Sequence, residues 1–141
     1  RTEPWHFYHL GAESVSKVVN LNAALVSAAK GEAAGEAKRQ RWSEIPGWLA
    51  VTCQRSDDPV RSQEDYAACC CAIQNLFLAL WPHGVGAKWT TGAVTRHPEF
   101  YQALQIDPDV EQVIGVLWYG YPAEIPVQKR RPVEDILIRL E

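Results

Sequence analysis

The sequence predicts an α+β protein with a mixed sheet flanked by helices, and three observations carry this prediction. Two nearly continuous apolar stretches, residues 48–53 and 112–121, are typical of buried strands. A third stretch, residues 63–80, has the length and composition of a buried helix. Strands and helices alternate irregularly, which favours one α+β unit, so we expect residues 1–141 to form a single domain.

The first third of the chain is expected to contain one strand followed by helix. Residues 5–10 are aromatic and follow a proline, which is typical of a strand. Residues 12–42 keep a rough apolar spacing of three to four, which indicates helix. Gly31 and Gly35 weaken the middle, so we expect two helices or one loose segment. The polar stretch 30–41 fits either a solvated surface helix or a mobile flap over a pocket.

The middle of the chain is expected to form a central strand and then the longest helix. The strand, residues 48–53, should be covered on both faces. Ser62, with Asp65 three residues later, has the pattern of a capping box that opens a helix over about residues 63–80. That helix is apolar on nearly every side, which places it either in a core or against a partner subunit.

The last part of the chain is expected to be less regular. Residues 81–86 break the long helix, and residues 88–92 are expected to form a short extended turn. His97 and a following proline open a helix that runs through residue 104. After the strand 112–121, residues 133–140 are expected to form a short turn and an extended tail.

Composition excludes several functional classes. The formal net charge of −3 gives no basic excess for nucleic acid or anionic lipid, and no apolar run reaches the ~18 residues of a membrane span. Cys69, Cys70 and Cys71 are consecutive, so on a helix their side chains point about 100° apart and do not converge on a metal. We therefore predict no metal site, and interpret the cysteines as small apolar residues in a reducing compartment.

A glycine-rich stretch invites comparison with nucleotide-binding loops. Gly84 and Gly86 follow a helix rather than a strand, and no third glycine has the Rossmann spacing; the P-loop pattern is absent too. The stretch leads into residues 88–92, Lys-Trp-Thr-Thr-Gly, which would place backbone N–H groups, two hydroxyls and an indole on an exposed edge. Such groups suit a planar heteroaromatic ligand; the alternative is an ordinary turn in which the threonines cap the chain.

A short basic run near the C-terminus is open to two interpretations. Lys129, Arg130 and Arg131 precede a proline and lie between two apolar segments. They are either a solvated charge run or the place where one guanidinium grips a phosphate through two hydrogen bonds.

Taken in order, several segments resemble the nitroreductase family over almost the whole chain. The matching stretches are Pro4–Phe7, Glu64 with Ala68 and Ala72–Leu76, Leu80–Gly92, Ile114–Pro122 and Lys129–Pro132. The resemblance implies an FMN-dependent oxidoreductase that takes hydride from NAD(P)H and reduces nitro compounds, quinones or similar small acceptors. It also implies an intertwined homodimer in the cytoplasm with FMN sites at the interface, and makes the apolar helix 63–80 the central dimer helix.

The same resemblance implies which residues hold the cofactor. Trp89, Thr90 and Thr91 match the turn that contacts the flavin, and Arg130 matches the basic residue that holds the FMN phosphate, with Arg131 as its neighbour. The bound flavin carries the chemistry, so no side chain is assigned as a catalytic acid or base.

One departure concerns the start of the chain. The family's N-terminal segment carries an Arg-Arg-Ser-like motif that also grips FMN, and it would lie before Arg1. We therefore expect an N-terminally incomplete domain that binds FMN weakly or not at all. Three alternatives stay open: a non-catalytic or degenerate flavin-binding domain, a thiol-based redox protein, and an interaction module without cofactor.

Overall fold

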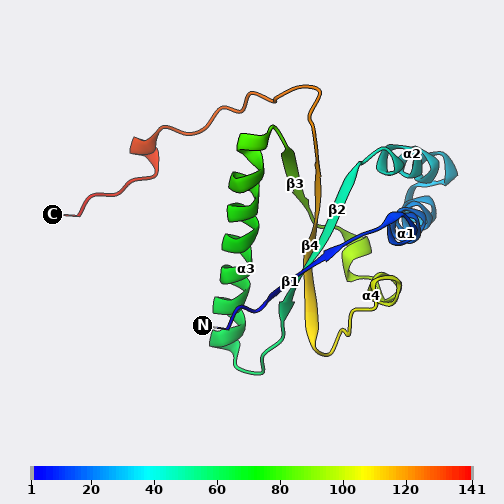
Figure 1. The fold of residues 1–141 in the computed structure, drawn as a ribbon, viewed down its shortest axis with the longest axis horizontal. Coiled ribbons are helices and arrows are strands. Elements are labelled where there is room, and N and C mark those ends of the chain that lie inside the picture. The colour runs from blue at the N-terminus through cyan, green and yellow to red at the C-terminus, as the bar shows by residue number, and fades with distance from the viewer. Residues whose placement is uncertain (1, 141) are drawn as a thin grey trace.

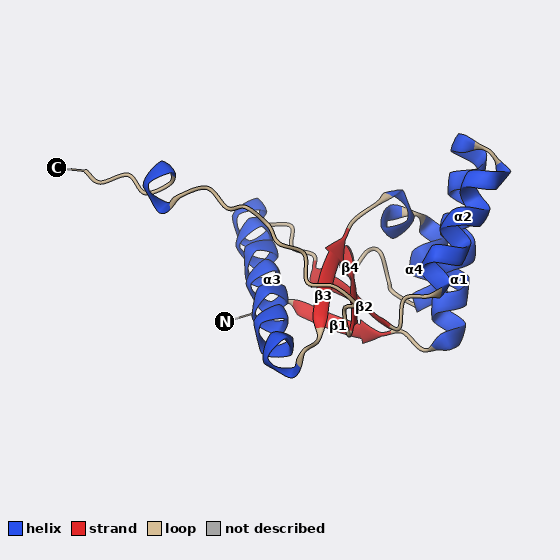
Figure 2. Ribbon diagram, turned by 90° about the horizontal axis from the view of Figure 1, so that it is seen from above, coloured by secondary structure: helices blue, strands red, loops and turns tan. Residues whose placement is uncertain are grey.

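A four-stranded sheet forms the centre of the protein. The structure is a computed structural model that describes residues 2–140. The strands lie in the order β1-β2-β4-β3, with bounds β1 (Trp5–His9), β2 (Gly47–Gln54), β3 (Gly86–Thr90) and β4 (Glu111–Gly120). Helix α3 (Pro59–Leu80) covers one face, and α1 (Ala12–Lys30), α2 (Glu32–Ser43) and α4 (Pro98–Leu104) cover the other (Figures 1 and 2).

The α+β class is confirmed, but the sheet differs from the prediction because all of its described strand pairs are antiparallel rather than mixed. The connection between β1 and β2 explains one of these pairings. Helices α1 and α2 form an antiparallel pair, so the chain leaves the sheet at the end of β1 and comes back to the same end. Strand β2 therefore starts beside the end of β1, with Leu49 opposite His9.

The prediction of two helices after the first strand is confirmed. The break falls at Gly31, whose φ of 91° is accessible to glycine and costly for other residues. Gly35 allows the two helices to approach closely, because a Cβ there would lie 1.8 Å from the Ser27 hydroxyl. The polar stretch proposed as surface helix or flap is therefore mostly α2, a regular helix packed along α1.

The start of α3 differs from the predicted capping box. The helix begins at Pro59, and the Asp58 carboxylate accepts hydrogen bonds from the backbone N–H groups of Val60 and Arg61. Ser62 lies inside the first turn. The prediction was wrong because a capping side chain satisfies free N–H groups only at the true first turn, and proline at the first helical position already marked that turn.

Helix α3 has two unlike faces. Cys69 and Ile73 are buried against the sheet, whereas Tyr66 is 43 % exposed and Leu78 is 61 % exposed. One face of this apolar helix is therefore buried within the chain, and burial on all sides within one chain is excluded. An apolar outward face remains.

Two cores lie on the two faces of the sheet. The core under α1, α2 and α4 is built around Trp48 and Phe100, and the core under α3 around Ile73 and Leu117. This arrangement confirms that residues 48–53 belong to a central strand covered on both sides.

The segment after α3 differs most from expectation. Residues 86–90 form the edge strand β3 rather than a turn, because they pair with β4 from Gly86 opposite Gly120 to Thr90 opposite Val116. The turn proper follows at residues 91–92. Beyond β4 the chain leaves the body as an arm, residues 121–140, that passes over the end of α3 and away from it (Figure 1). In the part of the chain that is described, no helix has the length and apolarity of a membrane span.

Candidate functional site

The turn after β3 presents open backbone. Gly92 is extended, and a Cβ built there would meet no atom within 4 Å. A ligand can therefore approach the backbone at this turn without steric obstruction. Thr90 is half-buried and Thr91 is exposed, so the two hydroxyls lie at the boundary between the protein interior and solvent.

Trp89 lies on the opposite side of β3 from its neighbours. Its half-buried indole packs into the core under α3, and its Nε1 donates to the Ile114 carbonyl oxygen at 3.2 Å. A Cβ on Gly115 would lie 2.0 Å from this nitrogen, so the indole rests directly on the β4 backbone. The Trp89 side chain thus fixes the strand from which the turn projects.

A groove of about 770 Å³ lies at the other end of β3. It runs between the C-terminal end of α3, the ends of β3 and β4, and the start of the arm. Aromatic rings and aliphatic side chains line most of it, and Lys88 and Arg130 supply two cations. A groove of this size and composition suits a planar aromatic ligand that carries an anionic group.

The structure therefore brings together only part of the predicted set. Thr90 and Thr91 lie at one end of β3, whereas Arg130 lines the groove at the other end, on the exposed arm. No contact between Arg130 and the turn occurs among the described residues of this chain.

Three tryptophans form a cluster between the turn and the groove. Ring centroids of Trp42, Trp48 and Trp118 lie 5.0–5.7 Å apart in edge-to-face geometry, which is favourable for aromatic pairs. Lys88 Nζ lies 5.6 Å from the centre of the Trp118 ring. The cluster joins α2, β2 and β4 into one rigid wall beside the turn.

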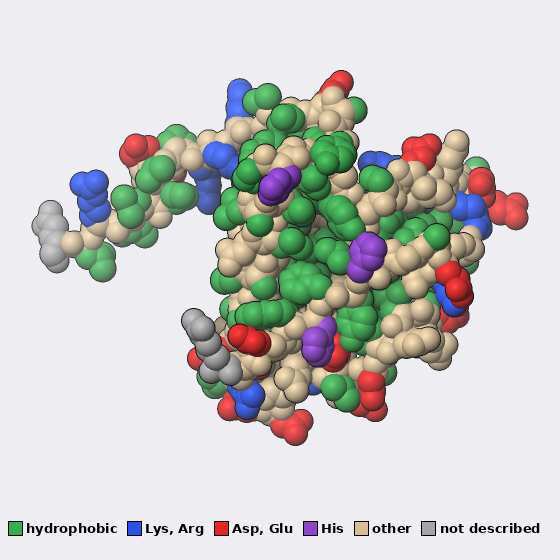
Figure 3. Space-filling model, in the orientation of Figure 1, with side chains coloured by type: hydrophobic (Ala, Val, Ile, Leu, Met, Phe, Trp, Pro, Cys, Tyr) green, Lys and Arg blue, Asp and Glu red, His purple; other side chains and the backbone are tan. Residues whose placement is uncertain are grey.

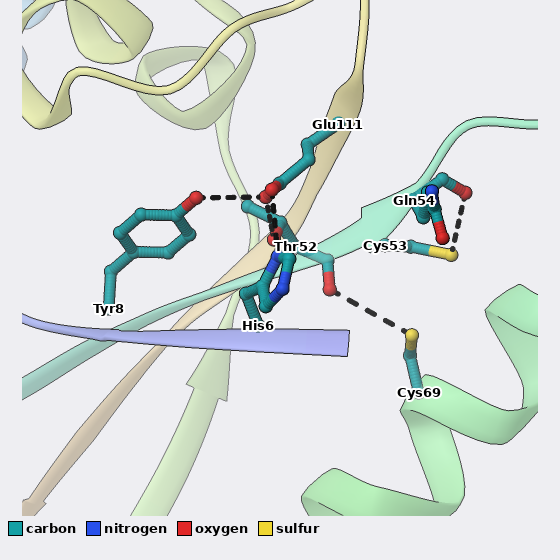
Figure 4. A network of polar contacts seen from close by, with 7 residues as sticks. All are labelled: His6, Tyr8, Thr52, Cys53, Gln54, Cys69 and Glu111. Carbon is teal, nitrogen blue, oxygen red and sulfur yellow. Dashed lines mark hydrogen bonds and ion pairs between the residues drawn. The ribbon is translucent and has the colours of Figure 1, made fainter. Parts of the chain in front are cut away.

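A polar network missed at the level of sequence surrounds Glu111, the first residue of β4. Its buried carboxylate accepts hydrogen bonds from the hydroxyls of Thr52 and, at 3.0 Å, Tyr8, and lies 2.7 Å from His6 Nδ1 (Figure 4). Burial raises the pKa of Glu111, but these hydrogen bonds from Thr52, Tyr8 and His6 together outweigh burial and hold the pKa below its ordinary value. The network ties the edge strand β1 to β2 and β4.

The two buried cysteines, Cys53 and Cys69, do not form a reactive thiol site. Burial raises the pKa of Cys53 and of Cys69, which disfavours the thiolate that redox chemistry needs. Cys69 Sγ instead donates weakly to the Thr52 carbonyl oxygen at 3.8 Å (Figure 4). Among the described residues, no three His, Cys, Asp or Glu side chains gather as possible metal ligands.

The architecture is α+β: an antiparallel sheet has one long helix on one face and a helical pair on the other, with an open turn at one end of β3 and an aromatic groove at the other. Comparison with known proteins gives the family. The sequence model of the Nitroreductase family matches residues 1–121, and the chain belongs to this family of oxidoreductases.

Individual relatives agree with this assignment. The chain is 33 % identical over 140 residues to YfhC of Bacillus subtilis, which is assigned by name to the NAD(P)H nitroreductases; the match spans 95 % of this chain and 71 % of YfhC. A nitroreductase-like family protein from Bacillus cereus has a similar crystal structure, with a TM-score of 0.82, 25 % identity, and coverage of 100 % of this chain and 75 % of that one. NfnB from Sphigopyxis sp. strain HMH, described as an FMN- and NADPH-dependent nitroreductase, shares the fold with a TM-score of 0.70 at 15 % identity, over 98 % of this chain and 80 % of NfnB.

Proposed function

We propose that the protein is an FMN-dependent oxidoreductase that reduces nitro compounds, quinones or similar small acceptors with NAD(P)H. The observation that carries this proposal is family membership over residues 1–121 together with an unobstructed backbone turn at residues 91–92. When bound, FMN supplies the redox chemistry by accepting hydride from NAD(P)H and passing electrons to the acceptor. The relative YfhC bears the name of such an enzyme.

The donor set of the chain fits FMN. The turn from Thr90 to Gly92 offers backbone N–H groups and hydroxyls to the polar edge of a flavin ring, and Trp89 holds the strand beneath the turn. Arg130 offers a guanidinium that is free to pair with a phosphate through two hydrogen bonds. No side chain is required as a general acid or base.

We also propose a homodimer formed through the outward face of α3 and the arm. Both surfaces carry large exposed apolar side chains, and exposed apolar patches of this kind mark interfaces. The exposed apolar residues are Tyr66, Leu78 and Trp81 on α3 and just after it, and Ile125, Val127, Ile136, Leu137, Ile138 and Leu140 on the arm. Figure 3 shows apolar side chains on the face above α3 and along the arm. Because Arg130 lies on this arm, a dimer would carry it toward the second copy.

A single substitution tests the dimer. Leu78→Glu places a charge on the outward face of α3, where the side chain is 61 % exposed and so leaves the fold of one chain intact. We expect light scattering to report a mass near twice the chain mass for the parent protein and a shift toward monomer for Leu78→Glu. Val110→Glu, at a 51 % exposed position just before β4 and on neither α3 nor the arm, is the control and should stay dimeric. A monomeric parent protein would refute the proposal.

Flavin titration tests the cofactor and its phosphate contact. Because the chain is expected to bind FMN weakly, the titration uses a large excess of FMN. We expect it to give a bound-flavin absorption spectrum that bleaches with NADH or NADPH under anaerobic conditions and returns with a nitroaromatic or a quinone. Arg130→Gln should raise the Kd for FMN about tenfold or more, because a charge-assisted phosphate contact of ~1.4 kcal/mol is lost. Arg131→Gln is the matched control and should change Kd less than twofold.

Riboflavin separates the phosphate contact from a general effect. It lacks the phosphate, so Arg130→Gln should leave riboflavin binding unchanged. Equal weakening of both ligands would show that Arg130 acts in some other way. A protein that stays colourless with FMN, both as this chain and as a chain extended upstream, would favour the non-catalytic alternative.

A further inference from the structure

A small internal cavity lies directly behind the turn. It has a volume of about 70 Å³ and is lined by residues of α1, the end of α2, the strands β2, β3 and β4, and the turn itself. Its walls combine the three clustered indoles with the side chains of Asn22, Thr90, Thr91 and Thr95. The cavity is therefore lined by both polar groups and aromatic rings.

Two buried hydrogen-bond donors, each on a residue that lines this cavity, have no partner. Asn22 is only 8 % exposed, and its Nδ2 makes no hydrogen bond; the same holds for Nε1 of Trp118. Among the described residues these are the only two buried side-chain N or O atoms without a partner, and both residues line this cavity. Buried polar groups without partners are rare, because desolvation without a new hydrogen bond is costly. Each donor therefore calls for an acceptor, and this cavity is a space that both residues border.

The lining also defines the chemistry of that acceptor. No Lys, Arg, Asp or Glu stands among the described residues around the cavity, so a bare anion would have no countercharge and would be costly to bury. A cavity needs roughly 10–15 Å³ to hold one water molecule with two to four polar partners. The volume and the polar groups here are sufficient for more than one water.

We propose that this cavity is an internal hydration site whose water molecules accept from Asn22 and Trp118 and link them to the turn at Thr90 and Thr91. Asn22, which is on α1 and outside the turn, then acts as a positioning residue for the turn. The link between the turn and flavin rests on the proposed function, whereas the hydration site and its effect on the turn do not.

The substitution Asn22→Leu gives opposite results for a hydrated and a dry cavity. Leucine has the same branching and the same number of side-chain heavy atoms, but it cannot form a hydrogen bond with water. In a hydrated cavity the substitution leaves the water molecules without a hydrogen-bond partner and should lower Tm by about 4 °C or more. In a dry cavity it removes an unpartnered donor and should raise Tm or leave it unchanged. Asn20→Leu, the same change at an exposed position on the same helix, is the control. It removes one exposed hydrogen bond from Arg39 and should shift Tm by less than half as much.

The experiment uses the whole chain without FMN, so its outcome is independent of the proposed function. We expect a high-resolution crystal structure to show ordered water within hydrogen-bonding distance of Asn22 Nδ2 and Trp118 Nε1. Hydrogen exchange at the amides of residues 91–92 should be at least threefold faster in Asn22→Leu and unchanged in Asn20→Leu, which separates local loosening of the turn from a global loss of stability. An empty cavity, a higher or unchanged Tm, or unchanged exchange at the turn would each overturn the proposal.

Discussion

Gly115→Ala should destabilise the protein by about 2–4 kcal/mol, although it adds a single methyl group. The added Cβ would lie 2.0 Å from Nε1 and 2.6 Å from Cδ1 of Trp89, and 3.1 Å from the Thr90 backbone oxygen. The indole cannot swing aside freely, because it is packed in the core under α3 and bonded to the Ile114 carbonyl oxygen. Urea unfolding monitored by circular dichroism would measure the loss.

A bulge explains why glycine is needed there. Val51 pairs with Gly115 and Thr52 pairs with Val113, so Ile114 is an extra residue on β4. A bulged residue leaves the ladder of backbone hydrogen bonds locally disrupted, and the Trp89 indole supplies a donor to the Ile114 carbonyl by lying over Gly115. The clash and the lost hydrogen bond therefore arise at one place.

A double-mutant cycle provides the control for this prediction. In a Trp89→Leu background the added methyl group has no indole to displace, so Gly115→Ala should cost less than half as much as it does alone. Gly11→Ala, where a Cβ meets nothing within 4 Å, should cost only about 0.5–1 kcal/mol, because alanine is a poorer N-cap of α1 than glycine. Equal costs in both backgrounds would show that Trp89 is not the source of the strain.

The elements that the sequence predicted well are those whose signals are local. Residues 48–53 and 112–121 are continuous apolar runs, and such runs identify strands that are covered on both faces without knowledge of their partners. The helix after His97 was also predicted, because a potential cap followed by proline is a local start signal; the His97 ring does accept from the Glu99 N–H group. The break between α1 and α2 at Gly31 was also indicated by a local signal, the glycine itself.

Strand β3 was missed because its identity depends on a distant partner. Residues 86–90 include a glycine and only one β-branched side chain, so local propensity gives no strand. Backbone pairing with β4, which places Lys88 opposite Trp118, overrides that propensity. The start of α3 is different, since Asp58 followed by proline was a visible signal that Ser62 obscured.

The residues of the candidate site likewise include some that the sequence indicated and some that it did not. Thr90, Thr91 and Arg130 came from resemblance to a family, and their roles stay predictions. Glu111 could not be found from sequence, because Thr52 and His6 lie 59 and 105 residues away from it along the chain. One partial signal was available: His6 and Tyr8 share a face of their strand through its period of two, so two polar rings on one face pointed to a buried acceptor.

Glu111→Leu should lower the free energy of unfolding by about 2–4 kcal/mol, because hydrogen bonds to a carboxylate contribute about 1.5–3 kcal/mol and the Thr52 hydroxyl would be left buried without an acceptor. Glu111→Gln should cost less, since one amide oxygen still accepts. Glu99→Gln, an exposed substitution on α4, is the matched control and should be within 0.5 kcal/mol of the parent, on the order of a typical surface change.

The same network should make the free energy of unfolding decrease as the pH falls. Its hydrogen bonds hold the folded pKa of Glu111 below the ordinary value of 4.5. A carboxyl group with a lowered folded pKa stabilises the protein fully above its unfolded pKa, and this stabilisation is lost as pH falls through the folded value. The difference in unfolding free energy between the parent and Glu111→Gln should therefore be constant above about pH 5.5 and shrink at lower pH. A difference that stays constant down to pH 3, or grows, would show that Glu111 is not ionised in the folded protein and that the network is held by a neutral acid instead.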